Sequence, residues 1–191
     1  IASKAMIVMR DEKKLLPLSP EKKILVIEQR IPYEFVGKDP YNHTHVFCEA
    51  MVNHSTNLVL ADTGFSAFED EIEECLELAK KVDLVVMTNY YARIVKSGNN
   101  QLLVKKLKDA GHQIVVVTNS PYIEGTTKEA DAAICNFSGT PDSIRVSTDL
   151  LFGKVKPYSK TKVPVTIGVP KAAPDKKLKP PKKHPLDLSY C

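Results

Sequence analysis

The sequence lacks the fingerprints of the common nucleotide-dependent and serine-dependent enzymes. No GxGxxG follows an apolar run, and no GxxxxGK[ST] is present to cradle phosphate groups. A GxSxG turn, which exposes the nucleophilic serine of α/β hydrolases, is also missing. Nucleotide cofactors and a serine hydrolase mechanism are therefore disfavoured, and we expect no cofactor.

Long apolar runs and paired cysteine motifs are missing as well. The longest runs, such as Ile114–Val117, fall far short of the roughly 20 residues that span a bilayer, and no secretory signal pattern is visible at the start. The four cysteines form no CxxC, and we interpret Cys48, Cys75 and Cys135 as buried free thiols because their neighbours are apolar. We therefore expect no membrane span and a cytoplasmic location.

Positive charge is confined to one end of the chain. Residues 1–153 contain 17 Lys+Arg and 21 Asp+Glu, a net charge of −4, whereas residues 154–191 contain 10 lysines and two aspartates, a net charge of +8. An acidic body repels phosphate, so we expect no nucleic-acid partner for it. The last 38 residues also hold 7 of the 13 prolines. This composition favours a solubilising disordered tail, and contact with anionic wall polymer, lipid headgroups or nucleic acid is the alternative.

Five short apolar runs predict the strands of a sheet. They lack polar alternation, which is typical of strands that are covered on both faces in a parallel sheet. The runs are residues 23–28, 57–60, 83–88, 113–118 and 130–135.

Helical patterns lie between these runs. Ser66 and Glu69 have the spacing of a capping box, and the apolar residues that follow up to Ala79 share one helical face. The acidic residues on the other side are interpreted as a solvated surface. They are Glu71, Glu73, Glu74 and Glu77. Further helices are expected over residues 41–53, over residues 98–110 with Gly111 as its stop, and from Pro141 to a stop at Gly153.

The alternation of strand and helix predicts an α/β fold. We expect a doubly wound, mostly parallel sheet with helices on both faces, followed by an extended basic C-terminal tail. Residues 1–21 are interpreted as an entry helix and linker from an upstream domain, residues 22–169 as the α/β sandwich domain and residues 170–191 as the Lys/Pro-rich tail. A last strand is expected at residues 164–167.

Ligands of doubly wound sheets bind beyond the carboxyl ends of the strands, where the strand order reverses. Polar and aromatic residues follow three of the predicted strands, and they suit a carbohydrate or another hydroxyl-rich ligand. These candidate ligand-binding residues are Glu28, Arg30, Asn89, Tyr90, Asn119 and Tyr122. The alternative is that they are ordinary polar loop residues, which strand ends commonly carry.

Neither a metal site nor a catalytic pair stands out. His43 and His45 are two residues apart and would face different sides of a helix, so we expect no metal site. Glycosidase chemistry needs two carboxyl groups placed across a sugar, and no spacing in this sequence selects such a pair. The acidic candidates include Glu28, Glu34, Asp39 and Asp62. We therefore assign no catalytic residue.

Short motifs follow one another in a characteristic order. They are residues 5–11 leading to Leu16-Pro17-Leu18, the Asn-Ser-Pro-Tyr segment in residues 115–122, Ala130-Asp131-Ala132, residues 147–153 ending in Leu-Phe-Gly, and residues 157–165 ending in Pro-Val. In this order they resemble the C-terminal domain of glycoside hydrolase family 3, and within that family the β-N-acetylglucosaminidase type. Residues 28–32 depart from the family, because a Gly-containing turn usually follows this strand.

The resemblance implies an α/β sandwich packed against a TIM barrel of about 250 residues, which carries the nucleophilic aspartate and for which this chain has no room. It implies an accessory domain, not catalytic alone, of a glycosidase acting on cell-wall amino-sugar glycosides. The first alternative is a free-standing module that binds a sugar or a muropeptide. The second is an interaction domain that only supports or dimerises a barrel. No feature of the sequence selects an oligomeric state.

Overall fold

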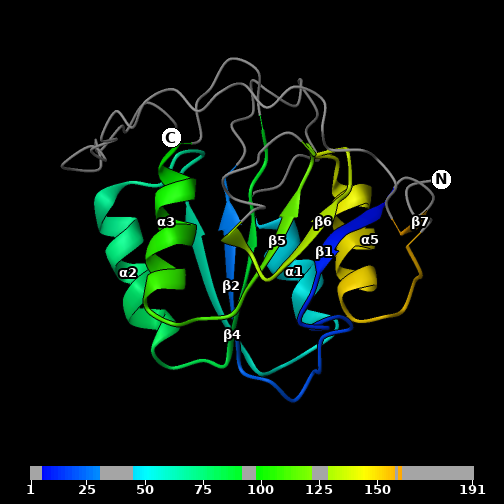
Figure 1. Cartoon of the computed structure of the whole chain (residues 1–191), viewed down its shortest axis with the longest axis horizontal. Coiled ribbons are helices and arrows are strands. Elements are labelled where there is room, and N and C mark those ends of the chain that lie inside the picture. The colour runs from blue at the N-terminus through cyan, green and yellow to red at the C-terminus, as the bar shows by residue number, and fades with distance from the viewer. Residues whose placement is uncertain (1–5, 31–44, 92–97, 122–128, 158, 161–191) are drawn as a thin grey trace.

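The computed structural model describes residues 6–30, 45–91, 98–121, 129–157 and 159–160 (Figure 1). Strands and helices alternate through most of this part of the chain. The strands are β1 (Ile7–Asp11), β2 (Ile24–Gln29), β3 (Leu58–Thr63), β4 (Leu84–Thr88), β5 (Ile114–Thr118), β6 (Ala132–Cys135) and β7 (Ser159–Lys160). The helices are α1 (Val46–Val52), α2 (Glu69–Ala79), α3 (Gly98–Asp109) and α5 (Pro141–Leu151).

The strands form one sheet in the order β3-β2-β4-β5-β6-β1-β7. From β3 to β6 all neighbours are parallel, whereas β1 runs antiparallel to β6 and parallel to β7. The chain passes from β2 outward to β3 and then returns to the other side of β2 to form β4. This reversal defines a doubly wound sheet, and the predicted fold class is confirmed.

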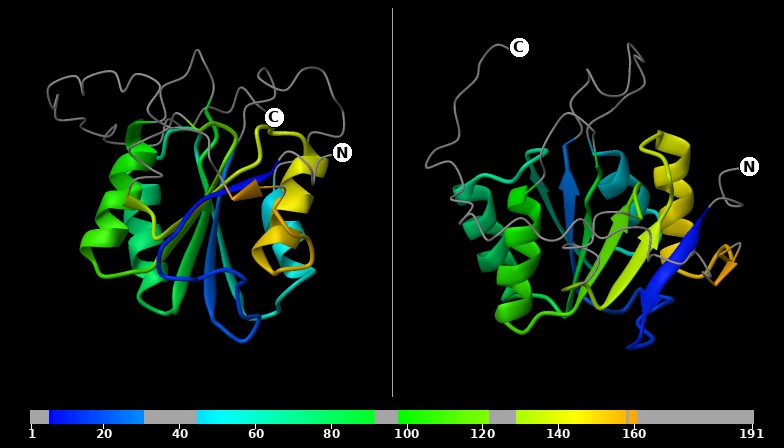
Figure 2. Two further views of the ribbon diagram at one scale, coloured as in Figure 1. Left: turned by 45° about the vertical axis from the view of Figure 1, so that its right-hand side comes forward. Right: turned by 45° about the horizontal axis from the view of Figure 1, so that its top comes forward.

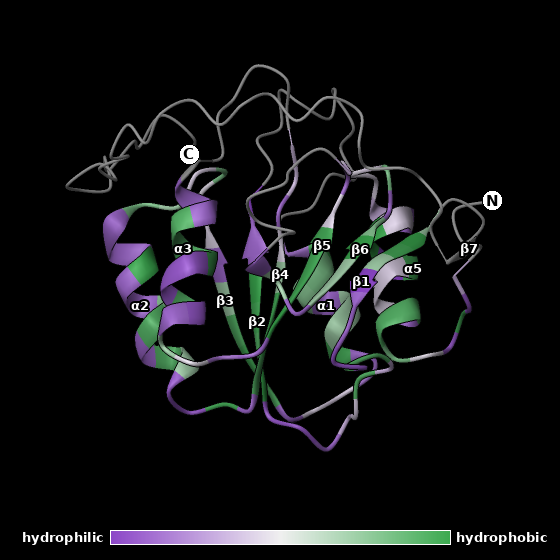
Figure 3. Ribbon diagram, in the orientation of Figure 1, coloured by the Kyte–Doolittle hydropathy of each residue, from purple (hydrophilic) through white to green (hydrophobic). Residues whose placement is uncertain are grey.

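Two helical layers cover the sheet (Figures 1 and 2). Helices α1 and α5 pack on one face against Ile24 and Val26 of β2, and helices α2 and α3 pack on the other face against Leu25 and Ile27. All four of these β2 side chains are completely buried. The unbroken apolar runs of the sequence therefore arise because both faces of the central strands lie in a core. Hydropathy colouring shows these strands mostly in green, the colour of hydrophobic residues (Figure 3).

The segment before the first predicted strand differs from the prediction. Residues 7–11 are not part of an entry helix but form β1, which pairs with β6 through a register that shifts between Val8 and Arg10. Only Ile7 is fully buried in this strand, and the next four residues are partly exposed. A strand with one partly open face does not need a continuous apolar run, which explains why the sequence pattern missed it.

Helix α2 begins differently from the predicted capping box. The helix starts at Glu69 with Phe68 as its N-cap, and the carboxylate of Glu71 accepts the Phe68 amide at 2.9 Å. The same carboxylate accepts the amide of Gly64 at 2.9 Å. Glu71 is therefore a buried structural group, and its assignment to the solvated acidic surface was wrong.

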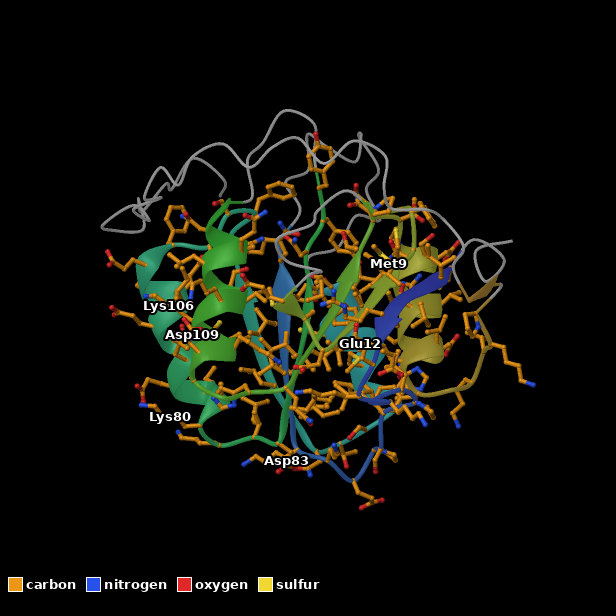
Figure 4. All side chains as sticks on the ribbon, viewed as in Figure 1. Met9, Glu12, Lys80, Asp83, Lys106 and Asp109 are labelled. Atoms are coloured by element: carbon orange, nitrogen blue, oxygen red, sulfur yellow. The ribbon has the colours of Figure 1, made fainter. Side chains whose placement is uncertain are left out.

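The outer surface of the α2 and α3 layer is charged. Lys80, which follows α2, and Lys106 and Asp109 of α3 carry their side chains on this outer side (Figure 4). Lys105 pairs with Asp109 one helical turn away at 2.7 Å, an exposed ion pair of the i,i+4 type. The outer side of this helical layer therefore faces solvent, and its inner side packs on the sheet.

Both predicted glycine stops are confirmed. Gly111 follows α3 with φ +89°, and Gly153 follows α5 with φ +72°, so each adopts the left-handed conformation that ends a helix. The two sites differ in their surroundings. A Cβ atom on Gly111 would have no neighbour within 4 Å, whereas one on Gly153 would lie 3.0 Å from the Cβ of Pro17.

The three cysteines of the described residues are buried and free, as predicted. Burial raises the pKa of Cys75 to about 12 and that of Cys135 to about 11. Burial, with nearby Glu28 and Asp62, raises the pKa of Cys48 as well. These thiols are therefore protonated side chains of the core.

Other predictions lie wholly or partly outside the described residues. The start of the helix expected over residues 41–53 falls there, as do the strand at residues 164–167 and the tail at residues 170–191. Within the described parts of the chain, no helix has the length and apolar character needed to cross a membrane.

Candidate functional site

The reversal of strand order lies between β2 and β4, so their carboxyl ends mark the expected ligand position. A hydrogen bond joins the two ends: the backbone amide of Gln29 donates to the hydroxyl of Thr88 at 2.8 Å. Most of the candidate residues predicted from the sequence lie on the segments that leave this edge of the sheet. The structure shows which of them are committed to internal contacts.

Glu28 holds the start of helix α1. Its two carboxylate oxygens accept the amides of Phe47 and Cys48, each at 2.9 Å. His45, the N-cap residue, makes no side-chain cap, and Glu28 supplies the missing acceptors from the neighbouring strand. Burial raises the pKa of Glu28, and the two amide hydrogen bonds oppose that shift. Its contacts are those of a structural cap.

Arg30 joins the ends of β2, β3 and α2. Its guanidinium lies 3.1 Å from the carboxylate of Asp62 and also pairs with Glu71, and its Nε donates to the carbonyl oxygen of Thr63 at 3.2 Å. The side chain is 39% exposed. Two carboxylates neutralise this cation, so the site has little attraction for an anionic ligand.

Two side-chain amides bracket the segment that follows β4. Gln29 Nε2 donates to the carbonyl oxygen of Tyr90 at 3.3 Å, and the Tyr90 amide donates back to Gln29 Oε1. On the other side, Asn119 Oδ1 accepts the backbone amide of Tyr91 at 2.7 Å, and Asn119 Nδ2 donates to the backbone carbonyl oxygen of Tyr91 at 3.1 Å. These amides take the place of strand neighbours and hold residues 90–91 in a fixed position.

Asn89 faces inward. Its side chain is completely buried, and its Oδ1 accepts a hydrogen bond from Asn100 Nδ2 of α3 at 3.2 Å. Asn100 also donates to the carbonyl oxygen of Phe65 at 3.0 Å and accepts the amide of Ala67 at 2.9 Å. Within the described part of the chain, Asn89 Nδ2 has no hydrogen-bond partner.

The two tyrosines after β4 have opposite environments. Tyr90 is 2% exposed and packs in the core on the α1 and α5 side, where burial raises the pKa of its phenol. Tyr91 is 49% exposed. Successive residues of extended chain point in opposite directions, so the aromatic ring offered to solvent is that of Tyr91. Tyr122 lies outside the described residues.

The six candidate residues predicted from the sequence leave out Tyr91, Gln29 and Asn100, which also contribute to this edge. Tyr91 and Gln29 stand directly beside predicted residues. The sequence therefore indicates the right segments but does not show in which direction each side chain points. Asn100 lies in the first turn of α3, far along the chain from β4, and no local pattern links it to Asn89.

The described residues place no group of three His, Cys, Asp or Glu side chains where they could hold a metal ion. Of the acidic candidates, Glu28 caps α1 and Asp62 pairs with Arg30. Glu34, Asp39 and His43 lie outside the described residues.

Two cavities lie elsewhere. One of about 400 Å³ runs between α1 and β3 and is lined by Cys48, Val52 and Leu60 among others. The other, of about 760 Å³, lies between β1 and the segment after α5, where Arg10, Leu150 and Lys156 contribute to its lining. Neither is lined by any of the six candidate ligand-binding residues.

Solved structures share this fold at low sequence identity. A glycoside hydrolase family 3 β-N-acetylglucosaminidase from Paenibacillus sp. superposes with a TM-score of 0.72 at 20% identity, covering 88% of this chain and 32% of that one. A β-glucosidase from Streptomyces venezuelae gives 0.62 at 12% identity, covering 82% and 36%. β-Glucosidase 3B from Thermotoga neapolitana gives 0.55 at 16% identity, covering 82% and 28%. The chain thus spans about a third of the length of these proteins.

A search of curated proteins finds no significant match. The model of the glycosyl hydrolase family 3 C-terminal domain, in contrast, matches residues 6–187. The match begins just before β1 and continues into the segment that the sequence set apart as a tail. The chain therefore belongs to the glycosyl hydrolase family 3 C-terminal domain family.

Proposed function

We propose that this chain is the C-terminal accessory domain of a family 3 glycoside hydrolase that acts on β-N-acetylhexosaminides of the cell-wall amino-sugar type. The observation that carries the proposal is the family match over residues 6–187. The amino-sugar assignment is supported by the resemblance of the motif order to the β-N-acetylglucosaminidase type and by the likeness of the fold to one such enzyme, with a TM-score of 0.72. The partner of the domain is then a TIM barrel in the same protein.

The domain alone is proposed to be non-catalytic. A glycosidase needs one carboxyl group as acid and a second as nucleophile or base, placed on either side of the glycosidic bond. At the described strand ends, Glu28 is held by two amides and Asp62 is paired with Arg30. Because internal contacts already occupy both carboxylates, they support a structural role at these strand ends.

The test is turnover of chromogenic N-acetylglucosaminide and glucoside by the purified chain and by the protein that includes the barrel. The chain alone is expected to hydrolyse neither substrate, and the longer protein is expected to prefer the N-acetylglucosaminide. Turnover by the chain alone that Glu28→Gln or Asp62→Asn abolishes would refute the accessory role. A preference of the longer protein for the glucoside would refute the amino-sugar assignment.

A second candidate function is a free-standing module that binds a sugar or a muropeptide. The exposed ring of Tyr91, whose backbone Asn119 holds next to the point of strand reversal, is the observation that favours it. Calorimetry of the chain with muropeptides tests this candidate. Saturable binding, together with the absence of any barrel in the mature protein, would favour it over the accessory role.

A further inference from the structure

Two exposed aromatic rings stand out at the carboxyl edge of the sheet. In the described part of the chain, four large apolar side chains are about half exposed, and two of these are aromatic. Tyr91 follows β4 and is 49% exposed, and Phe137 follows β6 and is 46% exposed. The other two, Val52 and Leu60, line the cavity between α1 and β3.

The strand order places the two aromatic residues on either side of the segment that follows β5. Strand β5 pairs with β4 on one side and with β6 on the other, and Tyr91 and Phe137 come shortly after the ends of β4 and β6. The backbone amides of Asn89 and Asn136 donate to carbonyl oxygens of β5 at 2.8 and 2.9 Å, so the pairing extends one residue past each of these strands. The ends of β4 and β6 are therefore two strand spacings apart, roughly 9.5 Å.

Both residues are held from the backbone. The Asn119 amide brackets Tyr91 through the two hydrogen bonds described above. Asn136 accepts the amide of Ser138 at 3.2 Å and donates to the hydroxyl of Ser147 at 3.0 Å, which fixes the turn that carries Phe137.

Phe137 adopts a conformation that its residue type disfavours. Its φ is +57°, in the left-handed region that bulky side chains rarely enter. The ring gains little from burial there, because it is 46% exposed. A strained residue that is also exposed is unexplained by packing, and such positions concentrate at ligand-contacting sites.

We propose that Tyr91 and Phe137 form an aromatic platform that binds a β-linked oligosaccharide of neutral amino sugars along the carboxyl edge of the sheet. This inference rests on the proposed function. In a β-linked pyranose the equatorial substituents leave C–H groups on both faces of the ring, and these apolar faces pack on aromatic rings. Sugars of an extended β-linked chain repeat their orientation at every second residue, so two separated rings can hold two sugars of one chain.

The charge at this edge favours a neutral ligand. Arg30 directly follows β2 at the strand reversal, and Asp62 and Glu71 already neutralise it. A phosphate or carboxylate would have to displace one of these partners. The side-chain amide of Asn119, which contacts the Tyr91 backbone, can instead supply polar contacts to sugar hydroxyl and acetamido groups.

The test uses the full 191-residue chain and two neutral probes, chitotriose and cellotriose, titrated by calorimetry and by amide chemical shifts. Chitotriose is expected to bind more tightly than cellotriose. Tyr91→Ala and Phe137→Ala are each expected to weaken chitotriose binding about three- to tenfold, the range that an aromatic contact contributes. Tyr91→Phe should retain binding. The matched control Leu60→Ala, within the outer strand β3 that β2 separates from β4, should leave it unchanged.

Phe137→Asn separates binding from stability. Asparagine tolerates the left-handed conformation better than phenylalanine, so this variant is expected to unfold at a higher temperature than the wild type while it loses chitotriose affinity. A purely structural phenylalanine would show the reverse, with a lower unfolding temperature and unchanged affinity.

The outcomes separate this inference from the proposed function. Binding of neither sugar at millimolar concentration, or binding that both alanine variants leave unchanged, overturns the platform, and turnover by the longer protein still decides the accessory role. Equal affinity for both sugars, lost in the alanine variants, supports the platform and counts against the preference for amino sugars. If an appended barrel shields both rings from solvent and no sugar binds, the rings belong to the domain interface and the platform is overturned.

Discussion

The carboxylate of Asp131 lies 2.5 Å from the Nζ of Lys108, which ties the chain just before β6 to the last turn of α3. Lys13, from the turn after β1, contacts the same oxygen at 2.7 Å. The other carboxylate oxygen accepts the amide of Ile114 at 2.9 Å. The Asp131 side chain is only 3% exposed, so one buried carboxylate joins four segments of the fold.

Asp131→Asn is expected to lower the free energy of unfolding by about 2–3 kcal/mol at neutral pH, because it leaves two lysines without their buried counter-charge. Burial alone would raise the pKa of Asp131, but the hydrogen bonds from Lys108, Lys13 and Ile114 outweigh it and lower the pKa. The stabilisation is therefore present above the unfolded pKa of 3.8 and is lost as the pH falls below it. Urea unfolding of both proteins between acidic and neutral pH measures this effect.

The control for Asp131 is Asp109→Asn, which removes the exposed Lys105–Asp109 pair. Its effect is expected to stay within about 0.5 kcal/mol. An equal loss in both variants, or a difference between wild type and Asp131→Asn that grows as the pH falls, would contradict the assignment.

Gln29→Leu is expected to cost about 2–4 kcal/mol of unfolding free energy. The side chain is 2% exposed, and its loss leaves the buried backbone amide of Tyr90 without its acceptor and removes one of the two donors to the carbonyl oxygen of Phe65, which Gln29 contacts at 2.6 Å. Chemical denaturation measures the loss. Asn53→Ala is the matched control, because Asn53 Nδ2 makes an exposed hydrogen bond to the carbonyl oxygen of Glu49, and little change is expected there.

Gly153→Ala is expected to destabilise the fold more than Gly111→Ala. Both glycines have positive φ, so either alanine pays for a left-handed backbone, about 1 kcal/mol. Only at Gly153 would the new methyl group also crowd Pro17, and overpacking of this kind adds roughly 1–3 kcal/mol. Thermal unfolding of the two variants gives the comparison, and a larger loss at Gly111 would be inconsistent with this contact.

Thiol labelling checks the burial of the cysteines. In a Cys191→Ser variant at pH 8, Cys48, Cys75 and Cys135 are expected to react with an aromatic disulfide reagent only as fast as the protein opens. The reason is that burial keeps their pKa far above the working pH, at about 12 for Cys75 and 11 for Cys135. Full reaction on adding denaturant is the internal control, and fast reaction of the folded variant would disprove the burial.

The parallel core was predictable because its strands carry their own signal. The runs at residues 83–88 and 113–118 have no polar alternation, and the structure buries β4 and β5 completely between two helical layers. Strand β1 lacks this signal. Its partner β6 lies more than 120 residues away, and nothing local in Met9-Arg10-Asp11 predicts that pairing.

The candidate site was predictable in position but not in detail. The pattern located the segment after β4, but which tyrosine faces outward depends on where the strand ends, since a shift of one residue exchanges the two sides. The Gln29 amide settles this by holding the Tyr90 backbone, a contact across 61 residues. The left-handed turn at Phe137 has no sequence signal, because the residue type argues against it.

The antiparallel pairing of β1 with β6 has a consequence for biosynthesis. Residues 7–11 are synthesised long before the strand that they pair with, which ends at Cys135. A β1 strand without β6 is an unpaired edge that can associate with other chains, so nascent chains that end before β6 are exposed to misassembly. The sheet is complete only once residues 159–160 have added β7 beside β1, and factors that shield the first strand during that interval would set the yield of folded protein.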